Sequence, residues 1–454
     1  MSSLSQEEIK ALEDDRVLLS GPVNGKRKVS AALLTPPSTQ GSLSSGSTSS
    51  ASVRVRAFNH SQAPFDLPES DESVAAVEWC GFTRTKAGEI YSRWLSRPNP
   101  QQNPDGLLEY MIGEINRLNM QPWNQAPIEQ AMTALGVSDE LQSVLTSPVY
   151  RQIFLSETLH YWLTDTIRDR YGSLKILQRK LKFRGANTVA RRKGGKRAKV
   201  IDVFDQTAST QASSSSSLPS QSQLSGSAIS SIQSDALPAA YVSVDSPPSI
   251  LPGHIVLYKG KSSVELLSER FIREDGSINM GSIESMKGGD FNQRRGAWYF
   301  SREEATAEQY RQWAAARNHT AETWIIRVQI PKDFIDGLRR KDLWYSPDWK
   351  TYVWYCRKGT SEGNPPAKFD VFWKPGQAQL IEGHICGRSP NIIPKIPKQD
   401  VQQRMSESDL LYNGNRKATQ CVFVDEEAVE RLGELIRGKI FIEIFPALQS
   451  SDFS

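Results

Sequence analysis

The stretch GAWYFSREEA, residues 296–305, passes from a strand pattern to a helix pattern within a few residues. Its aromatic part predicts a strand over 297–300, and the sequence that follows predicts a helix over 303–315. Glu304 stands three residues after Ser301, which is the spacing of a capping box, so we expect Ser301 to cap this helix. LYKG at 257–260 and TQCVFVDEEA at 419–428 also predict short strands, each carrying one polar residue in a fixed place.

These stretches belong to a region, from about 250 to 446, that holds nearly all of the strand signals in the chain. Many strands with few helices between them predict an α+β fold. The expected strands are 254–258, 297–300, 323–329, 352–356, 368–373, 379–385, 421–424 and 439–445. The expected helices are 263–270, 303–315 and 426–437, with Asp425 as the candidate cap of the last one.

Residues 74–185 predict a small helical domain without a catalytic constellation. One helix is expected to end before Pro98, a second to be capped by Asp105, and a third to run from about 128 to 135 and stop at Gly136. Ser147 followed by Pro148 predicts the start of the longest helix, which continues to about 181. We expect this domain to bind a protein partner of unknown identity.

Two segments are too polar and too rich in small residues to bury an apolar core. Residues 1–70 contain long Ser, Thr, Pro and Gly tracts and predict a disordered N-terminal tail. Residues 186–249, basic first and serine-rich afterwards, predict a disordered linker between the two folded parts.

The linker begins with a cationic run, RRKGGKRAK at 191–199. Together with the basic triplet at 26–28, it favours nuclear import over a merely solvated charge cluster. We therefore expect an intracellular protein, nuclear rather than cytoplasmic. A nucleic-acid contact through this run would be weak, because no aromatic side chains alternate with the cations to stack on bases.

Composition excludes several other classes of site. The net charge is only +4, so any basic surface must be local. Four scattered cysteines and five histidines share no spacing typical of a disulfide framework or a metal site, so we predict no metal. No run reaches the length of a membrane-spanning helix. The segment 253–262 ends in Gly-Lys-Ser, but six residues with a strand pattern separate its glycines, and a phosphate-binding loop has four between them.

Residues 254–440 resemble the ADP-ribosyltransferase fold of the diphtheria-toxin and poly-ADP-ribose-polymerase type. They look closest to a microbial domain family of unknown function with the patterns L-Y-H-G, G-D-F-G-x-G-F-Y-x-T and D-Q-x-x-F-x-T-x-x-A-L. The residues that line up are 289–291, Gly296, Tyr299, Ser301, 312–314, Gln420, Phe423, 427–428 and Leu432, with 352–354 and 369–371 matching intervening strands.

The resemblance implies a split β-sheet domain that binds NAD. Lys259 would donate to the adenosine-side ribose, and Tyr299 would stack on nicotinamide. Gln420 would accept from the nicotinamide ribose, so that Gln420 and Tyr299 form the catalytic pair. The rest of the implied cofactor-binding set is Tyr258, Gly260, Asp290 and Ser301, with Gly260 and Gly296 letting the backbone approach the ligand.

The residues at two motif positions depart from the family pattern. Lys259 stands where histidine or arginine is expected, and Gln420 stands where many transferases carry glutamate. Glutamine bonds a hydroxyl but carries no charge to stabilise an oxocarbenium-like transition state. The sequence therefore leaves two functions open: transfer of ADP-ribose to a macromolecular acceptor, or a catalytically inactive interaction protein with a degenerate transferase fold. A third interpretation treats the three stretches as an ordinary α+β core.

Overall fold

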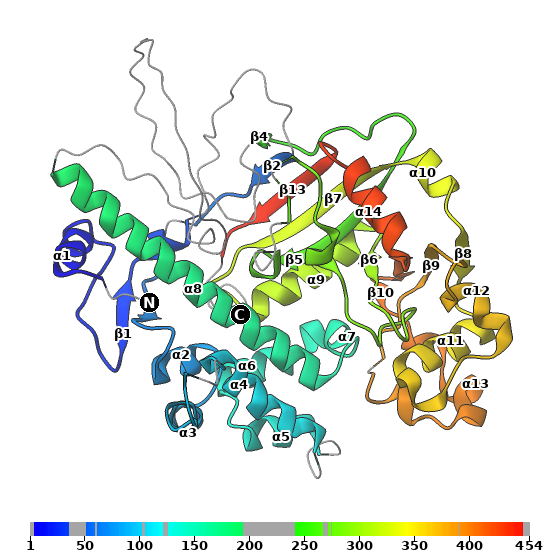
Figure 1. The fold of residues 1–454 in the computed structure, drawn as a ribbon, viewed down its shortest axis with the longest axis horizontal. Helices are drawn as coiled ribbons and strands as arrows, with labels where there is room; N and C mark the ends of the chain where they lie inside the picture. The colour runs from blue at the N-terminus through cyan, green and yellow to red at the C-terminus, as the bar shows by residue number, and fades with distance from the viewer. Residues whose placement is uncertain are drawn as a thin grey trace.

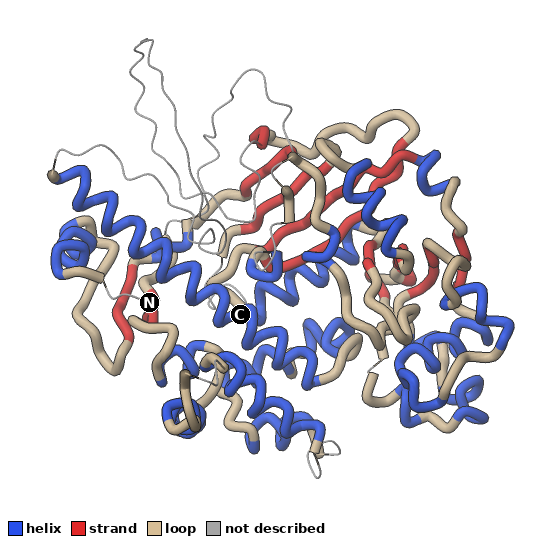
Figure 2. The backbone as a smooth tube through the Cα atoms, viewed as in Figure 1, coloured by secondary structure: helices blue, strands red, loops and turns tan. Residues whose placement is uncertain are grey.

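The computed structural model describes residues 4–35, 51–59, 61–101, 105–120, 126–193, 241–266, 271–273, 275–388 and 390–447. It combines helices with mixed sheets, so the predicted α+β class is confirmed. Most strands lie together in the upper right of the view in Figure 2, and helices dominate its lower part. Among these residues, no helix is both long enough and apolar enough to cross a membrane.

The larger sheet has five strands in the order β4-β2-β13-β7-β5. β13 pairs in parallel with β2 and antiparallel with β7, and β7 pairs antiparallel with β5. The β-branched run of β7 is buried along nearly its whole length, which suits a strand whose two sheet faces are both covered. The bounds are β4 (Tyr241–Ser243), β2 (Ala51–Val55), β13 (Ile440–Phe445), β7 (Thr323–Pro331) and β5 (His254–Ser262).

The smaller sheet has four strands in the order β6-β12-β9-β8, namely β6 (Trp298–Phe300), β12 (Thr419–Phe423), β9 (Leu380–His384) and β8 (Arg340–Leu343). β12 pairs antiparallel with β6 and β9. The two sheets meet where Tyr258 and Ser301 exchange backbone hydrogen bonds of 2.8 and 2.9 Å. Six of the eight expected strands are thereby confirmed, and those carrying the three opening stretches lie around this junction.

The helices that follow β6 and β12 are also confirmed. α9 (Glu304–Arg317) packs on β5 and β7, and α14 (Glu426–Leu435) begins at Asp425, whose side chain accepts from the backbone of Ala428 at 3.0 Å. The capping box at Ser301 is wrong, because Glu303 is the cap residue and Ser301 binds Glu303 instead. In the expected helix 263–270, the described part forms only a 3-10 turn over Val264–Leu266.

Two expected strands are helices. Residues 352–356 lie in α11 (Pro347–Lys358), and 368–373 cover parts of a 3-10 turn and of α12 (Asp370–Trp373). Start signals explain the first error: Ser346 caps α11 by accepting from the Trp349 amide, and Pro347 occupies the first turn. The aromatic residues of 352–356 were interpreted as strand formers, yet they are buried in a helical core. The remaining elements of this region are α10 (Lys332–Asp336), α13 (Val401–Arg404), β10 (Tyr412–Asn413) and β11 (Arg416–Lys417).

The helical region contains α2 (Val74–Trp79), α3 (Arg84–Leu95), α4 (Leu107–Ile115), α5 (Ile128–Ala134), α6 (Asp139–Leu145), α7 (Arg151–Phe154) and α8 (Leu159–Arg192). α3 ends before Pro98, and Gly136 follows α5 at a φ of 70°, as predicted. The cap of α4 is Gly106 rather than Asp105. The longest helix is α8, capped by Thr158, so the start predicted at Ser147 is wrong.

The prediction of a disordered N-terminal tail is wrong for the described residues. α1 (Gln6–Asp14) starts with a capping box of Ser5 and Glu8 and packs against α8. β1 (Lys26–Val29) pairs with β3 (Phe65–Pro68), and β2 lies inside the larger sheet (Figure 1). The serine-rich composition of this region predicted disorder, although Ala51 and Val53 alternate along β2 and are both buried.

The expected linker is also shorter than predicted, because α8 extends to Arg192 and β4 begins at Tyr241. Residues 194–240 lie outside the described residues, and with them most of the basic run. Its described part is engaged at the end of α8: Arg192 pairs with Asp14 at 2.7 Å and Lys193 with Glu7 at 2.7 Å. Nuclear import and nucleic-acid contact stay predictions.

Candidate functional site

A cavity of about 230 Å³ lies where the helical region meets the junction of the two sheets. One side, the sheet wall, consists of Tyr258–Lys261, the loop Ser285–Asp290, Tyr299–Ser301 and Gln420. The other side, the helix wall, consists of Ser156, Glu157, Tyr161, Trp162 and Asp165. All seven residues that the sequence analysis assigned to a binding or catalytic role line this one cavity, although they come from four separate stretches.

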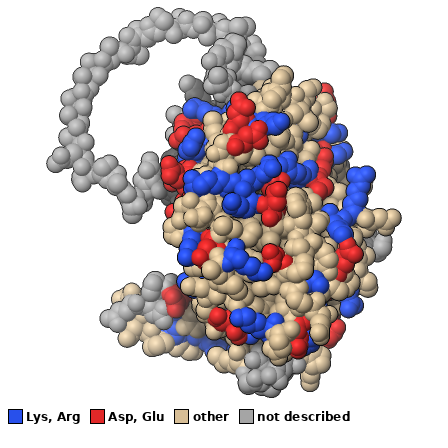
Figure 3. Space-filling view, turned by 90° about the vertical axis from the view of Figure 1, so that its right-hand side faces the viewer, with Lys and Arg blue, Asp and Glu red and all other residues tan. Residues whose placement is uncertain are grey.

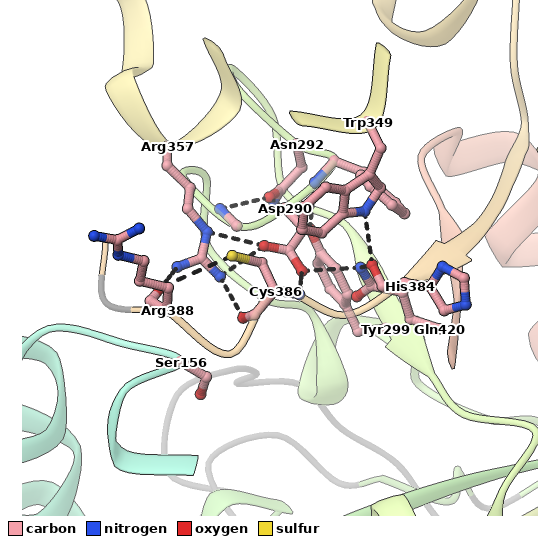
Figure 4. A network of polar contacts seen from close by, with 12 residues as sticks. Ser156, Asp290, Asn292, Tyr299, Trp349, Arg357, His384, Cys386, Arg388 and Gln420 are labelled. Carbon is pink, nitrogen blue, oxygen red and sulfur yellow. Dashed lines mark hydrogen bonds and ion pairs between the residues drawn. The ribbon is translucent and has the colours of Figure 1, made fainter. Parts of the chain in front are cut away.

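Asp290 is the centre of a saturated polar network in the sheet wall. Its Oδ1 accepts from Nε and Nη2 of Arg357 at 2.9 and 2.6 Å, and both side chains are buried. Its Oδ2 accepts from the backbone amide of Cys386 at 2.8 Å and from Nε2 of Gln420 at 3.0 Å. Figure 4 shows Asp290 between Arg357 and Gln420. The carboxylate predicted to bind the ligand thus holds the wall together.

The same network explains why residue 420 is glutamine. Its Nε2 donates to Asp290 and, at 3.1 Å, to the carbonyl oxygen of His384. Both partners are acceptors, so a glutamate here would oppose a carboxylate and a carbonyl in a buried site, which costs several kcal/mol in order of magnitude. Because both amide protons are used, Gln420 has only Oε1 left to accept from a ligand.

Tyr299 closes the loop that precedes β6. Its hydroxyl donates to Oδ1 of Asn292 at 2.8 Å and accepts from the backbone amide of Phe291 at 3.2 Å. Asn292 also accepts from Gly289 and donates to the carbonyl groups of Met286 and Arg295. Burial, reinforced by Asp290, raises the pKa of Tyr299 well above its ordinary value. The hydroxyl is therefore neutral and structural, while the half-buried ring lines the cavity.

Lys259 crosses the junction between the sheets. Its Nζ donates to the carbonyl oxygen of Tyr299 at 2.8 Å and lies 5.6 Å from the ring centre of Phe300. Burial, with some repulsion from Lys261, lowers the pKa of Lys259 to about 7. The ammonium thus exchanges between charged and neutral forms near neutral pH, which distinguishes it from an arginine in that place.

Gly260 allows close packing, and the Ser301 hydroxyl joins Glu303 to the backbone of Thr419. A Cβ at Gly260 would overlap the backbone carbonyl oxygen of Ala307, so this glycine allows α9 to approach β5. A Cβ at Gly296 would overlap the side chain of Glu284. The Ser301 hydroxyl lies 2.7 Å from Oε2 of Glu303 and 3.1 Å from the carbonyl oxygen of Thr419. Protein atoms occupy the Cβ position at both glycines, and the approach of their backbone to a ligand stays a prediction.

The helix wall is anchored by Trp313 of α9. Its ring centre lies 5.4 Å from those of Tyr150 and Trp162 and 6.3 Å from that of Phe154, all three from the helical region. Trp162 also donates from its indole to the carbonyl oxygen of Phe154 at 2.8 Å. These contacts fix the α7–α8 connection, which carries Glu157, against the sheet wall.

The carboxylates of the cavity differ in their partners. Asp165 accepts from Nη1 of Arg317 at 2.6 Å, Glu265 is paired with Lys261, and Asp290 with Arg357. Among the described residues, the Glu157 carboxylate has neither an ion pair nor a hydrogen-bond donor on another side chain. Burial raises the pKa of Glu157 to about 7; Arg357 opposes the rise, and Asp290 and Asp165 add to it. Perturbed carboxyl groups of this kind concentrate at functional sites.

Sequence reasoning missed the whole helix wall. Glu157 follows no motif, and only its place directly before the Thr158 cap distinguishes it locally. Its role depends on a contact between regions that are far apart in the chain. Within the described residues, no group of three His, Cys, Asp or Glu side chains could hold a metal ion, and all four cysteines are buried and unpaired.

The side of the molecule shown in Figure 3 mixes charges of both signs. A row of Lys and Arg side chains crosses it, with Asp and Glu side chains close by. Salt bridges such as Lys368–Asp348 and Lys374–Asp370 neutralise cations of the α11–α12 region.

No protein-family model, curated protein or solved structure matched the chain. The assignment of a function depends on the residues and on the geometry of the cavity.

Proposed function

We propose that the cavity binds NAD as a substrate and that the protein is an ADP-ribosyltransferase-like enzyme acting on a macromolecular acceptor. One observation carries this proposal: the residues that the motifs selected in advance, from four separate stretches, line a single cavity at the junction of two sheets. An ordinary core would give no reason for these polar side chains to converge on one space.

The groups that remain available match the chemistry of the nicotinamide–ribose bond. Its cleavage passes through an oxocarbenium-like state, so the site must hold the ring and accept from the ribose. The Tyr299 ring lines the cavity while its hydroxyl is engaged elsewhere. Oε1 of Gln420 is the acceptor left to meet a ribose hydroxyl.

The size of the cavity decides which end of the dinucleotide enters. Pockets for drug-sized ligands measure roughly 300–1,000 Å³, and this one measures about 230 Å³. The nicotinamide riboside end fits that volume better than the whole molecule. We expect the pyrophosphate to lie at the rim, where Lys287 is exposed on the loop of the sheet wall.

A second function, that of a non-catalytic interaction protein, is favoured by the saturation of the sheet wall. Asp290 binds Gln420 and the Cys386 amide, and the Tyr299 hydroxyl binds the Asn292 side chain, as expected for a structural core. The two functions differ in one measurable respect, because only the first requires NAD to stabilise the folded protein.

The test is an NAD titration of the full chain followed by thermal unfolding. A ligand at 100 times its Kd adds about 2.7 kcal/mol to stability, so millimolar NAD should raise the Tm. Lys287→Glu should weaken this effect by repelling the pyrophosphate, whereas Lys332→Glu, an equally exposed site outside the cavity, should not. Unchanged Tm at millimolar NAD in the wild type would refute the proposal and leave the interaction protein.

A further inference from the structure

The sheet wall offers no free carboxylate to a substrate among its described residues. Gln420 cannot be exchanged for glutamate without opposing Asp290 and the His384 carbonyl group. Asp290 itself receives four hydrogen bonds and has no capacity left for a substrate. A negatively charged or proton-accepting group must therefore come from another part of the cavity.

The helix wall supplies such a group. Four carboxylates of the described residues line the cavity, and three of them are committed: Asp165 to Arg317, Glu265 to Lys261, and Asp290 to Arg357. Glu157 is the fourth, and among the described residues no cation or donor side chain binds it.

Resting on the NAD-binding function, we propose that Glu157 is a catalytic residue that accepts the proton of the hydroxyl group attacking the ribose. In that step the bond between C1′ of the ribose and the nicotinamide nitrogen breaks, and nicotinamide leaves with the bonding electron pair. The attacking oxygen forms the new bond to C1′, and its proton passes to the Glu157 carboxylate. With water as the acceptor, NAD⁺ and water give ADP-ribose, nicotinamide and one proton.

The surroundings of Glu157 suit this role. Five ionisable side chains act on it electrostatically: Arg357 from α11, Asp290 from the sheet wall, Tyr310 from α9, and Asp165 and Tyr161 from α8. Burial and the two aspartates outweigh Arg357 and the hydrogen bond from the Thr158 backbone amide, and bring the pKa of Glu157 to about 7. A general base works best with a pKa near the operating pH, because it is then both deprotonated and basic.

The position of Glu157 is also fixed rather than incidental. It lies in the connection held by the Trp162–Trp313 contact and by the bond from the Ser156 hydroxyl to the Ile153 carbonyl oxygen at 2.7 Å. A positioned base contributes about 10²- to 10⁴-fold to the rate of proton transfer steps. The helical region is thus part of the reactive site, in addition to any partner it binds.

The experiment compares the full-length wild type with Glu157→Gln and with Glu129→Gln, an exposed glutamate on α5 outside the cavity. Isothermal titration with NAD measures binding, and nicotinamide release from NAD between pH 5.5 and 9 measures turnover. We expect Glu157→Gln to bind NAD within about threefold of wild type but to release nicotinamide at least about 100-fold more slowly. The wild-type rate should rise through pH 7 and level off, and Glu157→Gln should lose this rise.

The alternative outcomes are distinct. A wild type that does not bind NAD refutes the proposed function, and the role of Glu157 with it. NAD binding without nicotinamide release at any pH, or release by Glu157→Gln at the wild-type rate with the wild-type pH profile, overturns the role of Glu157 alone. Thermal unfolding of both variants verifies that they are folded, and Glu129→Gln should match the wild type in every measurement.

Discussion

The sheet wall and the helix wall of the cavity carry similar polar side chains but use them differently. In the sheet wall, Asp290 and Gln420 bind each other and the backbone, and the Tyr299 hydroxyl secures a loop. In the helix wall, Asp165 is paired with Arg317, while Glu157 has no partner among the described side chains. Polar groups hold the sheet wall together, whereas the helix wall offers the Glu157 carboxylate to a ligand in the cavity.

This difference shows that a motif and a reactive group can lie in separate regions of one chain. The motifs belong to the sheet wall, where they specify a junction of strands. Most hydrogen-bonding groups of these motif residues are already bound within the protein. Glu157, the cavity carboxylate whose pKa burial raises to about 7, belongs to the helical region, which the sequence analysis treated as a separate domain. The cavity therefore depends on how firmly the two regions pack, and the Trp313 contacts provide that packing.

The sharpest test of the sheet wall removes its central carboxylate. Asp290→Ala leaves Arg357 charged and buried without its partner, which costs about 3–5 kcal/mol for a pair of this kind. Urea unfolding at pH 7 measures the loss. Asp348→Ala is the matched control, because the Asp348–Lys368 pair is exposed and should contribute less than about 1 kcal/mol. Equal losses in the two variants would mean that Asp290 is not a structural centre.

Gly260 tests whether the sheet wall makes room for protein or for ligand. An added Cβ would overlap the Ala307 backbone, so Gly260→Ala should destabilise the fold by about 1–3 kcal/mol through overpacking. Gly113→Ala is the control: its Cβ would meet nothing within 4 Å, and alanine in that helix should stabilise by about 0.5–1 kcal/mol. If Gly260→Ala unfolded like the wild type but lost NAD binding, the space beside Gly260 would belong to the ligand.

The sequence predicted the secondary structure correctly where local signals agree with the tertiary structure. The β-branched and aromatic runs of β5, β6, β7 and β12 predict strands that the sheets confirm, and the helix at 426–437 begins at the predicted cap Asp425. Similarly, Gly136 ends α5 because its positive φ suits a residue without a Cβ. In each case one residue type has one physical role, and no distant contact is needed to recognise it.

The sequence failed where burial by distant segments overrides local preference. The aromatic run at 352–356 is helical because Ser346 and Pro347 start α11 and the surrounding core encloses it. β2 exists because it adds to the edge of β13, a partner nearly 400 residues away in the chain. Glu157 was overlooked because its environment is created only when α8 packs on the sheet junction.

The helix wall can be tested by the dependence of stability on pH. Because folding raises the pKa of Glu157 to about 7, its favourable contribution is complete below the unfolded pKa of about 4.3 and is lost as the pH rises through 7. Glu157→Gln should therefore come close to the wild type near pH 4 and exceed its stability by about 2–3 kcal/mol at pH 8, because solvent screening of this half-buried carboxylate reduces the full effect of about 4 kcal/mol. Urea unfolding at both pH values measures this. A difference that does not change with pH would mean that Glu157 titrates normally and is solvated.

The smallest expected effect separates the two parts of the Tyr299 side chain. Tyr299→Phe removes the hydroxyl that binds Asn292 and the Phe291 amide, so the free energy of unfolding should fall by about 1 kcal/mol. The ring remains, and NAD affinity should change less than about twofold. Tyr412→Phe is the control, since the bond of its hydroxyl to another described residue, at 3.3 Å to the Glu407 carbonyl oxygen, is exposed. If Tyr299→Phe lost NAD binding at wild-type stability, the hydroxyl would bind the ligand, and the sheet wall would share with the helix wall the task of holding the substrate.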